Sequence, residues 1–285
     1  MKYAAPTTVD EAVGLLASDD DARVFAGATD LIPQIRSGRP EPSVLVDLKR
    51  IDRLVGATET SGGWTVGAAT PTSTLTADAS FTAAFPGLSE ASGLIGSDQI
   101  QNRSSWGGNL CNASPAADSV PALVANGVRA VVAGSDGERT VPVEEIVTGP
   151  GQTSLAANEF VVEFEIDAPP AHTADAYLRL IPRTEMDIAV VGVAVRLTMD
   201  GDTCTDARVV LGAVAPTAVR VPDAEAALVG STLDAAALAA VAEAASAACN
   251  PIDDKRGTIE YRRQVAGVLA TRAATIAAAR AGGAS

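Results

Sequence analysis

The sequence SSWGGNLCNASPAAD spans Ser104 to Asp118 and combines paired glycines with short polar side chains. These polar side chains are too numerous for a simple turn and too short for a solvated surface. Because buried polar atoms must find hydrogen-bond partners, the stretch favours a loop that surrounds a polar ligand. Gly107 and Gly108 would let the backbone lie against a phosphate or a flat ring. On these residues alone, a long structured loop ending in a helix cap at Asp118 is the alternative.

A second stretch of small residues, FAGATDL, runs from Phe25 to Leu31. It lies between a predicted strand, Arg23 to Phe25, and a predicted helix, Leu31 to Arg36. Such a turn exposes unpaired backbone N–H groups at a helix start, where the helix dipole favours an anion. Thr29 and Asp30 are also ordinary helix caps, so a purely structural turn is the favoured alternative on these residues alone. The stretch is not a G-x-G-x-x-G fingerprint and does not indicate a Rossmann site.

The composition excludes several classes of function. The formal charge is −14, from 35 acidic and 21 basic residues, which disfavours nucleic acid and anionic membranes as partners. His172 is the sole histidine, so Ser-His-Asp and multi-histidine metal mechanisms are nearly excluded. The three cysteines form no C-x-x-C pair. An iron–sulfur cluster or a structural zinc normally needs about four ligands, so this chain alone is expected to carry neither. Any redox chemistry is therefore expected from a bound organic cofactor.

The compartment is expected to be the cytoplasm. Met1 to Pro6 has no apolar signal region, and no stretch reaches the ~18 apolar residues of a membrane span. A sparse, odd set of cysteines is typical of a reducing compartment.

The pattern of apolar residues predicts two units in the first part of the chain. In the first, a helix capped by Thr8 precedes the strand at Arg23 to Phe25, the helix at Leu31 to Arg36 and a strand at Val44 to Leu48, giving a βαβ-like unit. The second is predicted to contain strands at Trp64–Ala68, Val128–Ala133 and Phe160–Ile166, and helices near Ser73–Thr76 and Ala116–Val124.

A prolyl stretch from Ala168 to Ala171 predicts a domain boundary. Beyond it, Ile188–Thr198 and Ala207–Val214 are predicted strands, joined by a turn into an antiparallel hairpin. Helices are predicted at Asp223–Leu228, Leu233–Ala248 and from Ile259 to about Arg280, the last with Arg262, Arg263 and Arg272 on a polar side.

Together, the two ligand-like stretches resemble the FAD subunits of the xanthine dehydrogenase and carbon monoxide dehydrogenase group of molybdenum hydroxylases. The resemblance covers essentially the whole chain. It rests on Ala26–Leu31, Trp106–Asp118, Tyr177–Arg179, Arg183 with Asp187–Val191, Leu211–Thr217 with Arg220, and Glu260–Arg263.

The resemblance implies an α+β fold. A two-subdomain FAD-binding cradle like that of vanillyl-alcohol-oxidase flavoproteins (PCMH-like) would be followed by a C-terminal α+β domain with an antiparallel sheet and helices. The implied segments are 1–56 for the first FAD-binding subdomain, 57–170 for the second and 171–285 for the C-terminal domain.

The resemblance also implies roles for individual residues. Backbone N–H groups of residues 26–30 would hold the pyrophosphate of FAD, and Ser105 with residues 107–109 would hold the other side of the phosphates and the ribityl chain. Asp118 would bind sugar hydroxyls. Tyr177 would shield the flavin ring and Arg179 would stabilise its anionic reduced form. The implied cofactor-binding set is Ala26, Gly27, Ala28, Thr29, Asp30, Leu31, Ile95 (against the ring), Ser105, Trp106, Gly107, Gly108, Asn109, Ser114, Asp118, Tyr177 and Arg179.

The chain departs from the family pattern at two positions. Ala28 stands where relatives usually have glycine, which would restrict the turn. Trp106 replaces a smaller aliphatic residue, and we interpret it as core packing rather than flavin stacking. Arg183 and Asp187 have a structural ion pair as an alternative to any redox role.

The implied function is electron transfer, with no catalytic or metal-binding residue on this chain. Non-covalent FAD would pass electrons from the [2Fe-2S] clusters of a small partner subunit to NAD, a quinone, oxygen or another acceptor. A large subunit would carry the molybdopterin cofactor, and the family expectation is a dimer of heterotrimers. The substrate is set by the large subunit and is not indicated here.

Two other functions compete with this one. A standalone FAD-dependent oxidase of the same cradle fold often carries a histidine or cysteine for covalent flavin attachment and a substrate-capping domain, and neither is evident. A binding module that lost its flavin is opposed by the intact Gly107, Gly108 and Asp118.

Overall fold

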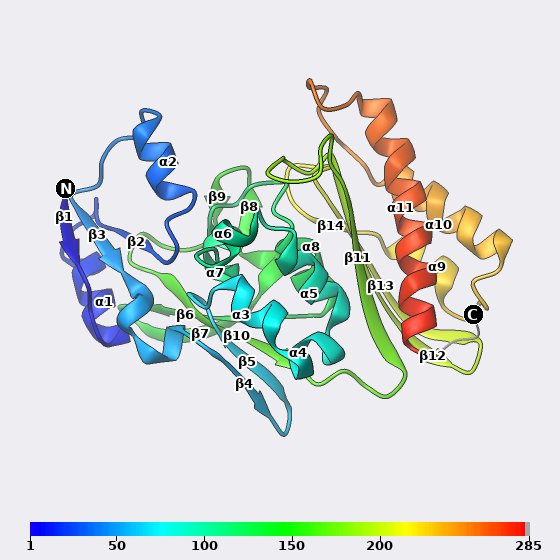
Figure 1. Ribbon diagram of the computed structural model, residues 1–285, viewed down its shortest axis with the longest axis horizontal. Helices are drawn as coiled ribbons and strands as arrows, with labels where there is room; N and C mark the ends of the chain where they lie inside the picture. The colour runs from blue at the N-terminus through cyan, green and yellow to red at the C-terminus, as the bar shows by residue number, and fades with distance from the viewer. Residues whose placement is uncertain (283–285) are drawn as a thin grey trace.

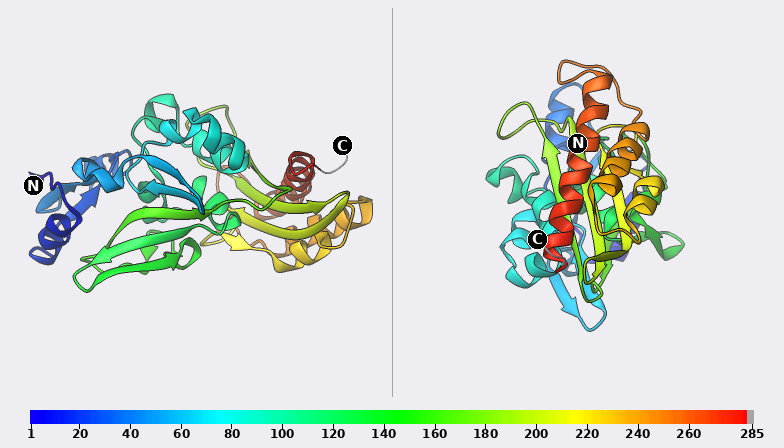
Figure 2. Two further views of the ribbon diagram at one scale, coloured as in Figure 1. Left: turned by 90° about the horizontal axis from the view of Figure 1, so that it is seen from below. Right: turned by 90° about the vertical axis from the view of Figure 1, so that its right-hand side faces the viewer.

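The computed structural model describes residues 1–282, which form three main sheets and the helices that cover them (Figure 1). The sheets follow one another along the molecule, with the N-terminus at one end and the C-terminus near the other (Figure 2). The α+β fold predicted from the sequence is confirmed.

The first sheet has three parallel strands in the order β1-β3-β2. The predicted helix cap at Thr8 is confirmed, since its side chain accepts a hydrogen bond from the N–H of Glu11. The predicted βαβ-like arrangement of β2, α2 and β3 is also confirmed, since β2 and β3 pair in parallel. The short strand β1 was not predicted. The elements are β1 (Lys2–Ala4), α1 (Val9–Ala17), β2 (Arg23–Phe25), α2 (Leu31–Arg36), β3 (Val44–Asp47) and two 3-10 turns (Leu48–Arg50 and Asp52–Leu54).

The second sheet has five antiparallel strands in the order β4-β5-β10-β6-β7. Helices α3 to α8 lie on one side of it, over a core that contains the side chains of Trp64, Phe81, Trp106 and Phe164. The elements are β4 (Ala57–Thr60), β5 (Gly63–Gly67), α3 (Thr72–Ala77), α4 (Ala79–Ala84), α5 (Pro86–Gly93), α6 (Asp98–Gln101), α7 (Trp106–Cys111), α8 (Ser119–Ala125), β6 (Arg129–Gly134), β7 (Gly137–Pro142), a 3-10 turn (Val143–Glu145), the small pair β8 (Val147–Gly149) and β9 (Gln152–Thr153), and β10 (Phe160–Asp167).

Two predictions for this unit were wrong. The stretch 104–118 is not one loop, because α7 forms inside it, capped by Ser105. The helix expected from Ala116 begins at Ser119, and the Asp118 side chain makes no capping hydrogen bond.

The third sheet has four antiparallel strands in the order β11-β12-β13-β14. The predicted hairpin of β12 and β13 is confirmed. Its first strand begins at Val191 rather than Ile188, whose side chain is exposed, and β11 was not predicted. The elements are β11 (Thr173–Leu180), β12 (Val191–Asp200), β13 (Thr203–Gly212), β14 (Val219–Arg220), α9 (Pro222–Leu228), α10 (Ala235–Ala247) and α11 (Ile259–Arg280).

The expected position of Arg262 on the polar side of α11 was wrong. Arg262 is 3% exposed, because its guanidinium turns inward. It donates to the carbonyl oxygens of Val190 and Ala213, at 2.7 and 3.3 Å, and to Asp254 at 2.7 Å. Loop carbonyls that would otherwise lack donors thus draw a charged residue into the core.

Strand β11 joins the third sheet to the helices of the second. The buried Asp175 carboxylate accepts hydrogen bonds from the N–H groups of Gly87 and Leu88, at 2.8 and 2.9 Å, at the start of α5. The side-chain amide of Asn126 donates to the same carboxylate at 2.8 Å. A buried carboxylate at a helix N-terminus is stabilised by those donors and by the helix dipole.

Candidate functional site

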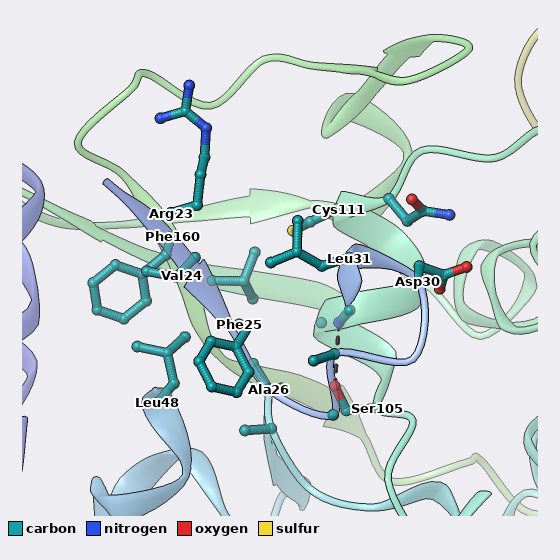
Figure 3. Close-up of a pocket in the computed structure, with 18 of the residues that line it drawn as sticks. Arg23, Val24, Phe25, Ala26, Asp30, Leu31, Leu48, Ser105, Cys111 and Phe160 are labelled. Carbon is teal, nitrogen blue, oxygen red and sulfur yellow. Dashed lines mark hydrogen bonds between the residues drawn. The ribbon is translucent and has the colours of Figure 1, made fainter. Parts of the chain in front are cut away.

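A cavity of about 400 Å³ lies between the first and second sheets (Figure 3). Its walls are β2 and the turn after it, the start of α2, α7 with the residues on either side of it, and residues 153–161 before and within β10. Figure 3 shows Phe25, Leu31 and Leu48 on the apolar part of the wall. The volume lies within the range of ~300–1,000 Å³ typical of small-molecule sites.

The turn of residues 26–30 presents backbone donors to this cavity. Within the described chain, the N–H groups of residues 27–30 have no protein acceptor. The carbonyls of Ala28 and Asp30 accept hydrogen bonds from Ile32 and Gln34 of α2, at 3.2 and 3.0 Å. The expected side-chain cap at Asp30 was wrong, since its carboxylate makes no capping bond. Two carbonyls of the turn are therefore held by α2, while the N–H groups of residues 27–30 are free for an anion.

Two positions make this turn tight. A Cβ on Gly27 would lie 1.8 Å from the carbonyl oxygen of Arg103, so this position accepts only glycine. Ala28 has φ +60°, in the left-handed region that favours glycine. The restriction expected at Ala28 is confirmed as a backbone conformation that alanine adopts at a cost of about 1–2 kcal/mol.

The start of α7 forms the opposite wall. Ser105 Oγ accepts a hydrogen bond from the N–H of Gly108 at 3.2 Å. A Cβ on Gly107 would lie 2.6 Å from the carbonyl oxygen of Ala68, whereas one on Gly108 would meet only Ser105 Oγ, at 3.4 Å. Gly107 thus lets α7 pack against the end of β5. Gly108, which has no side chain, leaves space for a ligand beside α7.

Asn109 is held in place by the next helix. Its Oδ1 accepts hydrogen bonds from the backbone N–H and the hydroxyl of Ser119, at 3.3 and 2.7 Å. With the amide oxygen satisfied, the Asn109 NH₂ group is the part of this side chain left to donate.

A buried cluster of Asp118, Tyr177 and Arg179 lies behind this wall. The Tyr177 hydroxyl donates to Asp118 Oδ1 at 2.9 Å, and Arg179 Nη1 donates to Oδ2 at 2.8 Å. Burial raises the pKa of Asp118 to about 6, while Arg179 and Tyr177 act to lower it. Burial, and then the Asp118 charge, raise the pKa of Tyr177, so its hydroxyl stays protonated.

Two family models together match nearly the whole chain. The model described as the FAD binding domain in molybdopterin dehydrogenase matches residues 1–169. The CO dehydrogenase flavoprotein C-terminal domain matches residues 176–277. The chain belongs to this flavoprotein family. The resemblance inferred from residues 26–31 and 106–118 is thereby confirmed.

Relatives with named activities are similar over their full length. The carbon monoxide dehydrogenase medium chain of Hydrogenophaga pseudoflava is 35% identical over 280 residues, covering 98% of this chain and 97% of the relative. The xanthine dehydrogenase FAD-binding subunit of Escherichia coli O157:H7 is 29% identical over 283 residues, covering 99% and 97%. Members of the flavoprotein family with these names are subunits of oxidoreductases.

Solved structures agree with these relatives. The structure of carbon monoxide dehydrogenase from Hydrogenophaga pseudoflava superposes with a TM-score of 0.94 at 37% identity, over 98% of both chains. That of quinoline 2-oxidoreductase from Pseudomonas putida 86 gives 0.92 at 30% identity, over 99% of this chain and 98% of that one. The family fold thus extends through all three sheets.

The cavity brings together most, but not all, of the residues expected to contact the flavin of this family. The residues that line it are Ala26 to Leu31, Ile95, Ser105, Gly107, Gly108 and Asn109, and those that do not are Trp106, Ser114, Asp118, Tyr177 and Arg179. Trp106 lies in the core, as expected for packing, and its indole N–H donates to Ser92 Oγ at 2.8 Å.

Several cavity residues were not predicted. Arg23, Arg39 and Cys111 line it, and Lys49 holds the turn from behind. The sequence near Lys49 carried only a strand pattern, and no local signal connects it with residue 26.

No group of three or more histidine, cysteine or acidic side chains within residues 1–282 is arranged to hold a metal ion. None of the helices in this range has the length and apolar character needed to cross a membrane. Arg183 and Asp187 form an ion pair, at 3.6 Å, which was the structural alternative to a redox role, and Arg256 also pairs with Asp187, at 3.2 Å.

Proposed function

We propose that this chain binds FAD non-covalently in the cavity and serves as the electron-transfer subunit of a molybdenum hydroxylase complex. The observation that carries the proposal is the turn of residues 26–30, which lines the cavity opposite α7 and whose N–H groups at residues 27–30 have no protein acceptor. This donor set suits an anionic pyrophosphate. Membership of the flavoprotein family supports FAD as the molecule to which this pyrophosphate belongs.

The residues of the cavity would divide the cofactor among them. The N–H groups of residues 27–30 would bind the pyrophosphate, and Ser105, Gly108 and Asn109 would lie along the phosphates and ribityl chain. Ile95, 8% exposed, would pack against the flavin ring. Trp106 would support α7 from the core. Ser114 and the cluster of Asp118, Tyr177 and Arg179 would complete the site from behind the wall.

Bound FAD would supply reversible electron transfer between the [2Fe-2S] clusters of a small partner subunit and an external acceptor such as NAD, a quinone or oxygen. The residues of this chain bind and orient the cofactor and exclude water from it. A large subunit would carry the molybdenum cofactor.

We further propose that the complex is a dimer of heterotrimers in the cytoplasm. Within this chain, we propose segments 1–56, 57–170 and 171–285 as the structural units, each of which holds one of the three sheets.

The proposal is tested on the purified chain by its absorbance spectrum and by denaturation. FAD released into the supernatant, with no iron–sulfur absorbance, is the expected result. Flavin that stays with the precipitated protein would favour a covalent flavin oxidase. A folded, colourless chain that refuses added FAD would favour a binding module that lost its flavin.

A further inference from the structure

The ammonium group of Lys49 is anchored behind the turn of residues 26–30. Its Nζ donates to the carbonyl oxygen of Ala26 at 2.7 Å and to Asp47 Oδ1 at 2.6 Å. It also lies 4.4 Å from the centre of the Phe25 ring, a cation–π contact. The Tyr3 hydroxyl donates to the other carboxylate oxygen of Asp47, at 2.8 Å. Lys49 is thus held from three sides.

The contact with Ala26 sets the direction of the next peptide N–H. In a trans peptide the C=O and N–H point to opposite sides. Because the Ala26 carbonyl points to Lys49, the N–H of Gly27 points away from Lys49. The carbonyls of Ala28 and Asp30 are likewise bound, by α2. Of the three carbonyls of the turn that accept a hydrogen bond, Ala26 is therefore the one that is bound by Lys49 and not by α2.

The charge of Lys49 is matched by Asp47. The carboxylate is 11% exposed and the ammonium 28%, so the pair is largely withdrawn from water. Nζ is not among the groups that line the cavity. Attraction of a ligand by net charge is weak for such a neutralised pair, whereas its effect on the backbone is direct.

From these contacts we infer that Lys49 is a positioning residue for the phosphates of the cofactor, with Asp47 as its orienting partner. It holds the turn of residues 26–30 in the conformation that leaves the N–H groups of residues 27–30 free for an anion. This inference rests on the proposed function, since it takes the pyrophosphate of FAD as the ligand of that turn.

The test is a titration of the apo-protein with FAD, and with ADP as a probe that keeps the pyrophosphate and adenosine but lacks the flavin. Because Lys49→Met removes a charge-assisted hydrogen bond, we expect it to lower the affinity for both FAD and ADP by about 10- to 100-fold. Lys49→Arg, which keeps the donor, recovers most of the affinity. Lys255→Met, at an exposed lysine far along the chain, serves as the matched control and binds as the wild type does.

Asp47→Asn separates positioning from charge. If Lys49 positions the turn, loss of its partner weakens FAD binding. Tighter binding would mean that Lys49 acts through its charge, and would overturn the inference. Unchanged FAD and ADP affinity in Lys49→Met, with the wild type binding both, would also overturn it and leave the proposed function standing. A wild type that binds neither ligand would overturn both. Thermal unfolding of each apo variant confirms that the fold is kept.

Discussion

Arg179 donates one hydrogen bond to Asp118 Oδ2 at 2.8 Å and another to the carbonyl oxygen of Leu94 at 2.7 Å, both from Nη1. Strand β11 thereby reaches the residue next to Ile95, which lines the cavity. Both charged side chains are buried, with Arg179 4% and Asp118 10% exposed. The third sheet is thus connected to the proposed flavin site through one buried ion pair.

The ion pair predicts strong coupling between its two members. Arg179→Met leaves Asp118 without a counter-charge and is expected to destabilise the chain by about 3–5 kcal/mol. Adding Asp118→Asn removes the stranded charge and should recover most of that loss. Urea unfolding at pH 7.5 measures both. A double variant whose loss of stability equals the sum of the losses of the two single variants would contradict the coupling.

Asp118 also predicts a pH dependence of stability. Its pKa is raised from 3.8 to about 6 in the fold, chiefly by burial. The folded state therefore binds the proton more tightly than the unfolded state, and its stability falls as the pH rises from about 4 to about 6. The shift corresponds to about 3 kcal/mol.

Asp118→Asn removes this titration. Relative to the wild type, the apo variant should gain stability over that pH interval and show no further relative change above pH 7. Denaturant unfolding of both proteins at pH 4.5, 5.5 and 7.5 gives the comparison. A constant difference between them at all three values would refute the raised pKa.

The turn of residues 26–30 predicts opposite effects at adjacent positions. Ala28→Gly relieves the left-handed backbone but adds freedom to the unfolded chain, so the expected gain is up to about 1 kcal/mol. FAD binding should persist. Gly27→Ala, by contrast, forces a clash with the Arg103 carbonyl and should cost of the order of 1–3 kcal/mol. Thermal unfolding distinguishes the two, and equal effects would show that the turn is not as tight as described.

Gly108 offers a variant that separates binding from folding. Because a Cβ there meets only Ser105 Oγ, Gly108→Val should fold, while its side chain fills part of the cavity and abolishes FAD binding. Gly14→Val, at an exposed helical glycine with open space around it, is the control and should bind FAD normally. Full FAD occupancy in Gly108→Val would remove α7 from the proposed site. Gly107 is unsuitable for this test because of its contact with Ala68.

The local signals of the sequence predicted much of the fold. Residue periodicity and caps located α2, α11 and the hairpin of β12 and β13. They did not reveal β11, because Asp175 and Arg179 place charges at positions that become buried. They also hid α7, since a glycine pair lowers helix propensity and the stretch reads as a loop.

The candidate site was predictable where its chemistry is local. The turn of residues 26–30 and the start of α7 both carry their small residues in sequence, and both line the cavity. Partners distant in sequence were not predictable: Lys49 with Ala26, and Arg179 with Asp118, meet only through tertiary packing. A helix cap at Asp118 was a sound local prediction, but the buried Arg179 and Tyr177 claim its carboxylate instead.

The most direct test of the account is calorimetric titration of the apo chain with FAD. We predict saturable binding of one FAD per chain, lost in Gly108→Val and retained in Gly14→Val. A folded wild-type chain that takes up no FAD, or that binds it equally well in both variants, would contradict the assignment of this cavity as the flavin site.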